Sequence, residues 1–167
     1  LGTHLEVEAS KVISQEPHPC SSGTDIQIKN LFYNIPARRK FLKSNAVELK
    51  HIIDQFQRIA LAYPDISFKL VNEETELFEL PKTTLRQRIV AVFGKKYNER
   101  LVPIDESTAF IKIKGFLCKP EYARKKRGDQ YFFINHRFIK SNYLLHAVGK
   151  AFHDLISRDV HPGYFIY

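Results

Sequence analysis

Hydrophobic and polar residues alternate over residues 4–8 with the period of two that half-buried strands show. This alternation predicts a strand over residues 4–8, and a second strand is expected over residues 11–14 after a short turn. Ile26 and Ile28 continue the pattern after a polar loop, so a third strand is expected over residues 23–30.

A helical period replaces the alternation after Ser44-Asn45, which is a favourable N-cap pair. We expect a helix over residues 46–63, stopped by Pro64, and then a hairpin over residues 66–80. The apolar side chains of this helix recur at helical spacing, and we expect them to be buried. They are Val47, Leu49, Ile52, Ile53, Phe56, Ile59, Ala60 and Tyr63.

The second half of the chain mixes helical and strand patterns. We expect a helix over residues 85–93, capped by Thr83 or Thr84 and ended by Gly94. Strands are expected over residues 101–104, 110–117 and 129–135. A helix over residues 142–157, capped by Asn142, and a strand from residue 164 follow. Pro81-Lys82-Thr83 has the composition of a boundary. We therefore expect an α+β protein in two lobes, residues 1–81 and 82–167.

Composition narrows the class of protein. The 167 residues, 44% of them hydrophobic, suffice for one large domain or two small ones. No apolar run approaches the roughly 20 residues of a membrane helix, and no signal peptide is visible. Cys20 and Cys118 lack metal-ligand spacing and are expected to be free thiols in a reducing cytoplasm. Because Met is absent, we expect the chain to be a piece of a longer protein.

Positive charge is concentrated in one short segment of a chain whose net charge is +8. Tyr33-Asn34 is turn chemistry, and Pro36 suits the first position of a helix. The cations Arg38, Arg39 and Lys40 follow at once. Cations at a helix start oppose the macrodipole, so an anionic partner such as DNA is the better explanation for them.

Two blocks of sequence resemble the MutL family of DNA mismatch repair proteins. The first is Gly23-Thr24 followed by Leu31-Phe32-Tyr33-Asn34-Ile35-Pro36-Ala37-Arg38-Arg39-Lys40-Phe41-Leu42, and the second runs from Gln130 to Lys140. The resemblance covers residues 23–155 in the family's order. It implies the C-terminal part of the Bergerat-type ATPase sheet shared with gyrase, Hsp90 and histidine kinases, followed by a ribosomal-protein-S5-domain-2-like transducer domain.

The resemblance assigns a nucleotide role to Gly23 and Thr24, which lie beneath the adenine in the family. ATP and Mg²⁺ would be cofactors of the longer protein. The family's catalytic Glu, Mg²⁺-binding Asn, adenine loop and lid would precede residue 1, and its transducer Lys would follow residue 167. We therefore expect this chain to hold no nucleotide and to hydrolyse no ATP by itself.

The resemblance also places Lys40, Lys43 and Arg58 in a basic groove that holds DNA by its phosphates, without sequence specificity. The other DNA-binding candidates are Arg38, Arg39, Arg137 and Lys140. Arg38 has the alternative of structural hydrogen bonds. The whole set has the alternative of a solvated surface with local pairs such as Lys50–Asp54. The loop Arg124–Arg127 is a further DNA contact or a solvated segment.

Two details of the second block carry separate expectations. The family has Gly where this chain has His136, which predicts a left-handed backbone there. The run Tyr131-Phe132-Phe133 resembles a base-stacking platform, but core packing is the preferred interpretation.

The function that the resemblance implies is ATP-dependent N-terminal dimerisation and DNA clamping, which couple mismatch recognition to strand incision. The implied partners are DNA, a MutS-type mismatch recognition protein, a helicase, an endonuclease and a second copy of the longer protein, with no membrane. A type II topoisomerase-like ATPase and transducer fragment is one alternative, which the Leu31–Arg38 run argues against. A non-enzymatic nucleic-acid-binding module is the other.

Overall fold

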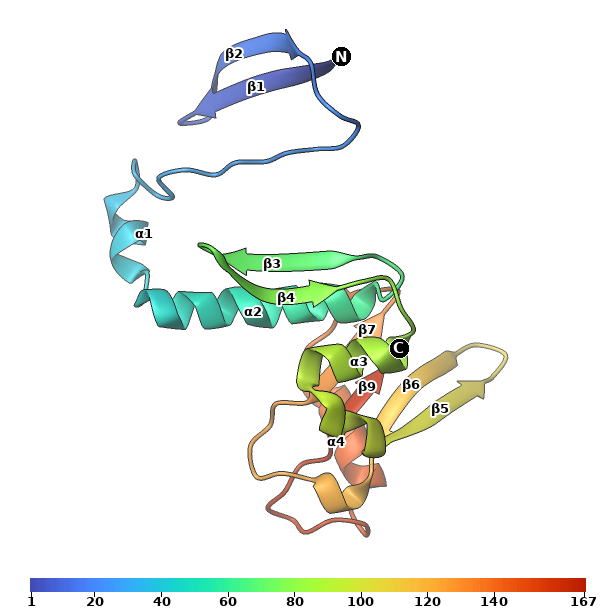
Figure 1. Ribbon diagram of the computed structural model, residues 1–167. Coiled ribbons are helices and arrows are strands. Elements are labelled where there is room, and N and C mark those ends of the chain that lie inside the picture. Colours follow the sequence, from blue (N-terminus) through green and yellow to red (C-terminus); the bar gives the residue numbers. More distant parts are fainter. The chain divides into compact units, whose positions relative to one another are not determined.

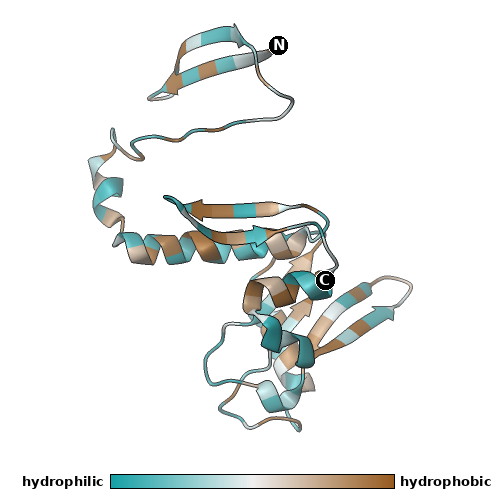
Figure 2. Cartoon of the chain, in the orientation of Figure 1, coloured by the Kyte–Doolittle hydropathy of each residue, from teal (hydrophilic) through white to brown (hydrophobic).

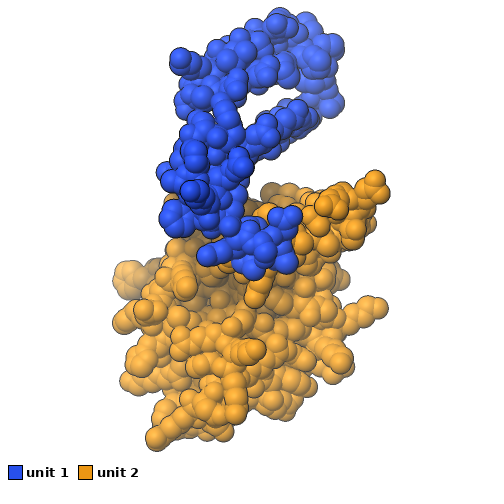
Figure 3. Space-filling model, turned by 90° about the vertical axis from the view of Figure 1, so that its left-hand side faces the viewer, with its two compact units in different colours: residues 1–48 blue, residues 49–167 orange.

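The computed structural model describes residues 1–167, which form two compact units, residues 1–48 and residues 49–167 (Figure 1). Figure 3 colours the two units separately. The lobe boundary predicted between residues 81 and 82 lies inside the second unit and stays a prediction.

The first unit begins with an antiparallel ribbon of β1 (Gly2–Glu8) and β2 (Lys11–His18). Ala9 and Ser10 both have positive φ, as tight two-residue hairpin turns require. Brown and teal alternate along β1 in Figure 2, the pattern from which this strand was predicted. The face that carries Leu5 and Val7 is not covered, because these side chains remain 54% and 55% exposed.

The strand predicted over residues 23–30 is wrong. The backbone there pairs with no other segment, and the side chains of Ile26 and Ile28 are 77% and 78% exposed. A strand exists only when a neighbour takes its backbone N–H and C=O groups. Ile26 and Ile28 therefore have the alternation of a strand, but no second strand forms backbone hydrogen bonds with this segment.

Two helices follow. Helix α1 (Pro36–Phe41) has proline in its first turn, as predicted. Helix α2 (Asn45–Ala62) begins in the first unit and continues into the second. The Ser44 carbonyl accepts the amides of Val47 and Glu48, which confirms the predicted start of α2 within one residue.

Only part of the apolar stripe of α2 is buried. The hairpin of β3 (Phe68–Asn72) and β4 (Thr75–Leu80) covers one face, and its Phe68 and Phe78 lie 6.1 and 5.4 Å from the Phe56 ring. Ile52 and Ile59 lie outside this contact, each 53% exposed. The prediction that the whole stripe is core is therefore wrong, because the stripe is wider than the face that packs.

Helix α3 (Leu85–Phe93) has the predicted bounds. The Thr84 hydroxyl accepts from the Gln87 amide, and Gly94 with φ +96° ends the helix before the 3-10 helix η1 (Lys95–Glu99). The side chain of Arg88 on this helix is fully buried, which the sequence did not suggest.

A five-stranded sheet completes the second unit. Its members are β5 (Leu101–Ser107), β6 (Lys112–Cys118), β7 (Gln130–Ile134), β8 (Arg137–Phe138) and β9 (Tyr164–Ile166), in the spatial order β5-β6-β9-β7-β8. Only β7 and β9 are parallel, and the chain passes through β8 and α4 (Asn142–Ala151) between them. The 3-10 helix η2 (Pro120–Tyr122) follows β6.

Helix α4 differs from its prediction at both ends. Ser141, not Asn142, caps it, since the Ser141 hydroxyl accepts from the Leu144 amide. The helix ends at Ala151 and not near residue 157, because the chain turns at Phe152, whose amide bonds back to Val148.

The core of the second unit is aromatic. The rings of Tyr131 and Phe165 are stacked 5.4 Å apart, and Phe93 packs against both. Tyr131 and Phe133 are 8% and 2% exposed, which confirms that this run packs in the core. Burial raises the pKa of Tyr131 to about 12. None of the helices is long and apolar enough to cross a membrane.

Candidate nucleic-acid interface

Helix α1 and the residues after it form an exposed basic segment without acidic neighbours in sequence. Residues 36–43 contain the cations Arg38, Arg39, Lys40 and Lys43 and no acid, and all four are exposed. None of them forms a salt bridge. Their charges are therefore available to an anionic ligand.

The cations of α1 lie at its end and not at its start, contrary to the prediction from sequence. Helix α1 has only six residues, so Arg38, Arg39 and Lys40 lie in its last turn. Cations near a helix C-terminus are favourable, not opposed. The Glu48 carboxylate accepts the backbone amide of Lys43 at 2.8 Å, but no cationic side chain of the segment forms a salt bridge. The case for an anionic partner consequently rests on the exposure of these side chains and on their lack of salt bridges.

The turn before α1 is tightly built. Asn30 and Phe32 have φ of +50° and +63°, and the Tyr33 amide donates to the Asn30 carbonyl at 2.9 Å. The Tyr33 hydroxyl donates to Glu8 at the end of β1 (3.1 Å), and this hydrogen bond raises the pKa of Tyr33. Strand β1 and the base of the basic helix are thereby joined within the first unit.

The structure distinguishes Arg38 from its neighbours. Its guanidinium carbon lies 6.0 Å from the centre of the Phe32 ring, at the outer limit of a cation–π contact, and its side chain forms no hydrogen bond. The alternative of structural hydrogen bonds for Arg38 is therefore not observed. Arg39 and Lys40 line an open hollow together with Pro36.

In the second unit, Arg58 on α2 and the β7–β8 hairpin come together. The Arg58 guanidinium carbon lies 4.4 Å from the centre of the Phe138 ring, so the ring fixes the cation without neutralising it. Arg137 precedes Phe138 on β8, and Lys140 follows it; both are exposed and without a salt bridge. The Lys50–Asp54 pair is likewise not formed.

The turn of this hairpin contains a residue whose contact the sequence did not reveal. Asn135 and His136 have φ of +49° and +64°, which confirms the expected left-handed position. His136 Nδ1 lies 2.9 Å from the Ala62 carbonyl at the end of α2, and its ring stacks on Tyr63 at 5.2 Å. His136 therefore joins the hairpin to the helix that carries Arg58.

The candidate nucleotide residues Gly23 and Thr24 are both exposed in the unpaired segment. No atom lies within 4 Å of the place where a side chain would begin at Gly23. The residues present therefore do not enclose a nucleotide. No group of three His, Cys, Asp or Glu side chains is arranged to hold a metal ion.

Comparison with known proteins gives a consistent answer. Residues 89–167 match the family described as DNA mismatch repair protein, C-terminal domain. Over its whole length the chain is 56% identical to the DNA mismatch repair protein MutL of Christiangramia forsetii and 48% identical to that of Bacteroides fragilis. It spans 27% of the length of each.

Solved structures agree with the sequence comparison. The Aquifex aeolicus MutL ATPase domain complexed with ADP superimposes with a TM-score of 0.73 at 26% identity, over 97% of this chain and 60% of that one. The same domain with a K252N mutation gives a TM-score of 0.69 at 26% identity, over 99% and 60%. The mixed α/β fold is thus that of part of a MutL ATPase domain.

Proposed function

The chain belongs to the MutL family of DNA mismatch repair proteins, and from this premise we propose that its basic segment binds the DNA backbone. The contacts of the proposal are charge-assisted hydrogen bonds from Arg38, Arg39, Lys40 and Lys43 to phosphate oxygens. Such contacts position DNA without reading its sequence. This suits a repair protein that must act at any site.

The proposal rests on the exposure of these four cations and on their lack of salt bridges. They lie within six positions of one another, every one is exposed, and none is paired with an acid. A surface whose lysines serve only solubility is expected to intersperse both signs of charge. The run without acids is better suited to a polyanion.

The second unit adds a further set of phosphate contacts to the proposal. Arg58 is held over the Phe138 ring, while Arg137 and Lys140 are free at the surface of the same region. A guanidinium fixed by an aromatic ring keeps its charge and loses less conformational entropy when it binds.

The function of the longer protein is proposed from its relatives. We include ATP-dependent N-terminal dimerisation that closes on DNA and couples mismatch recognition to incision, with ATP and Mg²⁺ as cofactors. The partners would be a second copy, a MutS-type protein, a helicase and an endonuclease. Residues 1–81 would complete the ATPase lobe, with Gly23 and Thr24 near the nucleotide, and residues 82–167 would belong to the transducer domain.

The binding test is fluorescence anisotropy of a labelled duplex of arbitrary sequence at low salt. We expect Lys40→Glu/Lys43→Glu to weaken binding about tenfold or more, because two phosphate contacts become repulsions. The matched control is Lys82→Glu/Lys112→Glu, which makes the same charge change at two exposed lysines of the second unit. Equal weakening by both variants would mean that only net charge matters, and the basic segment would lose its assignment.

A further inference from the structure

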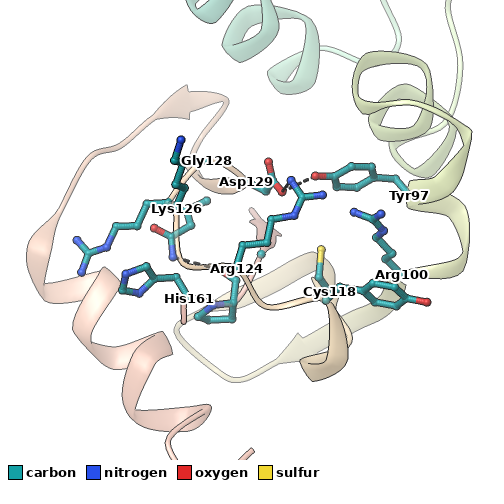
Figure 4. Close-up of a pocket in the computed structure, with 13 residues that line it drawn as sticks. Tyr97, Arg100, Cys118, Arg124, Lys126, Gly128, Asp129 and His161 are labelled. Atoms are coloured by element: carbon teal, nitrogen blue, oxygen red, sulfur yellow. Dashed lines mark hydrogen bonds and ion pairs between the residues drawn. The ribbon is translucent and has the colours of Figure 1, made fainter. Parts of the chain in front are cut away.

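A small hollow in the second unit is lined mainly by cationic and aromatic side chains (Figure 4). Tyr97 and Arg100 contribute from the region of η1, and Tyr122 from η2. The loop 124–130 and the segment 161–163 before β9 complete it. The hollow is open to solvent. Of the DNA-binding candidates named above, only the loop Arg124–Arg127 contributes to its lining.

Arg100 is held in this hollow by two aromatic rings. Its guanidinium carbon lies 4.9 Å from the centres of both the Tyr97 and the Tyr122 rings. It forms no salt bridge. Aromatic rings fix a guanidinium while leaving its full charge, so Arg100 is a positioned cation without a counter-ion.

The loop across the hollow is anchored at two points. Arg124 exchanges both backbone hydrogen bonds with His161, at 3.0 and 2.7 Å, and its guanidinium pairs with Asp129 at 3.2 Å. The Tyr97 hydroxyl donates to the same Asp129 carboxylate, and Figure 4 shows these side chains pointing toward one another. The Asp129 carboxylate is thus already bound by two groups of the fold, the Arg124 guanidinium and the Tyr97 hydroxyl.

The remaining charges of the lining are unpaired. Lys126 and Arg127 are exposed and form neither a hydrogen bond nor a salt bridge. The lining holds four fixed cations, Arg100, Arg124, Lys126 and Arg127, against the single carboxylate Asp129, a net of +3. A concave surface with this excess concentrates anions.

We propose that this hollow is a phosphate site that takes one phosphodiester group of a nucleic-acid backbone. Arg100 and Arg127 would donate to the phosphate oxygens, with Lys126 adding a mobile charge. Tyr97 is only 5% exposed and Tyr122 faces Arg100, so the lining offers charge and not a stacking surface for a base. Contact with the backbone alone is the recognition that such a lining supports.

The inference rests on the proposed function only in naming nucleic acid as the source of the phosphate. The experiment therefore uses two probes on the isotopically labelled chain, inorganic pyrophosphate and a short DNA duplex, at constant ionic strength. Amide shifts of Gly128 and Gly163, which line the hollow, report binding. Lys40→Glu/Lys43→Glu serves as the background in a parallel titration, so that loss of the α1 contacts is recorded separately.

The expected result is saturable shifts of both glycines with both probes, also in the Lys40→Glu/Lys43→Glu background. Lys126→Gln/Arg127→Gln should weaken pyrophosphate binding about fivefold or more. Those two side chains form no hydrogen bond or salt bridge in the fold, so the variant is expected to fold, and Lys82→Gln/Lys112→Gln controls for the lost charge. Shifts with pyrophosphate alone would overturn the assignment to nucleic acid. Shifts with neither probe, or equal weakening by the control, would overturn the site.

Discussion

The buried Arg88 holds three segments of the second unit together. Its side chain is fully buried, and Nη2 donates to the carbonyl oxygens of Pro64 (3.0 Å), Ile66 (2.6 Å) and Pro81 (3.0 Å). It thereby joins the end of α2, the start of the β3–β4 hairpin and the linker to α3. We predict that Arg88→Met destabilises the second unit.

The magnitude follows from which carbonyls lose a donor. The Pro64 carbonyl keeps the Thr83 amide at 2.9 Å, so the substitution leaves two carbonyls, those of Ile66 and Pro81, without their donor. An unpartnered carbonyl costs about 1–3 kcal/mol when it is buried, so about 2–6 kcal/mol is the upper bound for these two part-buried carbonyls.

An opposing contribution reduces this cost. Arg88 Nε and Nη1 are buried without partners, and desolvation lowers the pKa of the guanidinium. Arg88→Met removes the buried charge and with it the desolvation penalty, which offsets part of the lost stability. We therefore expect a net loss of about 2–3 kcal/mol in the free energy of unfolding, near the low end of the range for the two carbonyls.

Urea unfolding followed by circular dichroism measures this loss, with hydrogen exchange of the α3 amides as the local readout. Arg88→Lys keeps the charge but not the planar donor fork, and it should fall between wild type and Arg88→Met. Arg158→Met, at an exposed position, is the control and should leave stability unchanged. An Arg88→Met variant as stable as wild type would refute the reasoning.

Three further predictions each rest on one local feature. A methyl group at Gly115 would lie 1.9 Å from the Phe165 carbonyl oxygen at φ +142°, so Gly115→Ala should cost about 3 kcal/mol in urea unfolding; an unchanged midpoint contradicts this. His136→Gly relieves a left-handed backbone that His136→Ala keeps, so thermal unfolding should find the Gly variant more stable than the Ala variant by about 1 kcal/mol, and the reverse order would count against that strain. Burial raises the pKa of Tyr164 from 10.0 to about 12. Its contribution to stability is present below pH 10 and is lost as the pH rises toward 12, by at most about 1.4 kcal/mol per pH unit. Tyr164→Phe should flatten that decline in urea titrations, and an unaltered slope would be inconsistent with the shift.

Elements with local stop and start signals were predictable from sequence. The bounds of α3 were predicted because Thr84 caps one end and Gly94 adopts a positive φ at the other. The β3–β4 hairpin was predictable because the polar residues Asn72-Glu73-Glu74 separate two apolar runs, and Glu73 lies in the observed turn with φ +54°. Both depend on chemistry within a few residues.

Features that depend on a distant partner were not predictable. Ile26 and Ile28 have the alternation of a strand, but no neighbouring strand pairs with them. Arg88 has the composition of a surface residue, and only the carbonyls gathered around it explain its burial. The spacing of residues in the sequence does not show which distant groups come together in the fold.

The local features of the candidate interface were predictable from sequence, and its long-range contacts were not. The exposure of Arg38, Arg39 and Lys40 was predictable from the run of cations without acids. The seating of Arg58 on Phe138 joins residues far apart in sequence, so only the fold reveals it. The macrodipole argument failed because it depended on the length of α1, which the sequence pattern does not define.

The salt dependence of DNA binding tests the central claim most directly. The logarithm of affinity should fall linearly with the logarithm of salt concentration, with a slope of about −0.9 for each phosphate contacted. If Lys40 and Lys43 each contact a phosphate, Lys40→Gln/Lys43→Gln should make the slope shallower by about 1.8. A wild-type slope near zero, or a variant with an unchanged slope, would contradict the assignment of the basic segment to the DNA backbone.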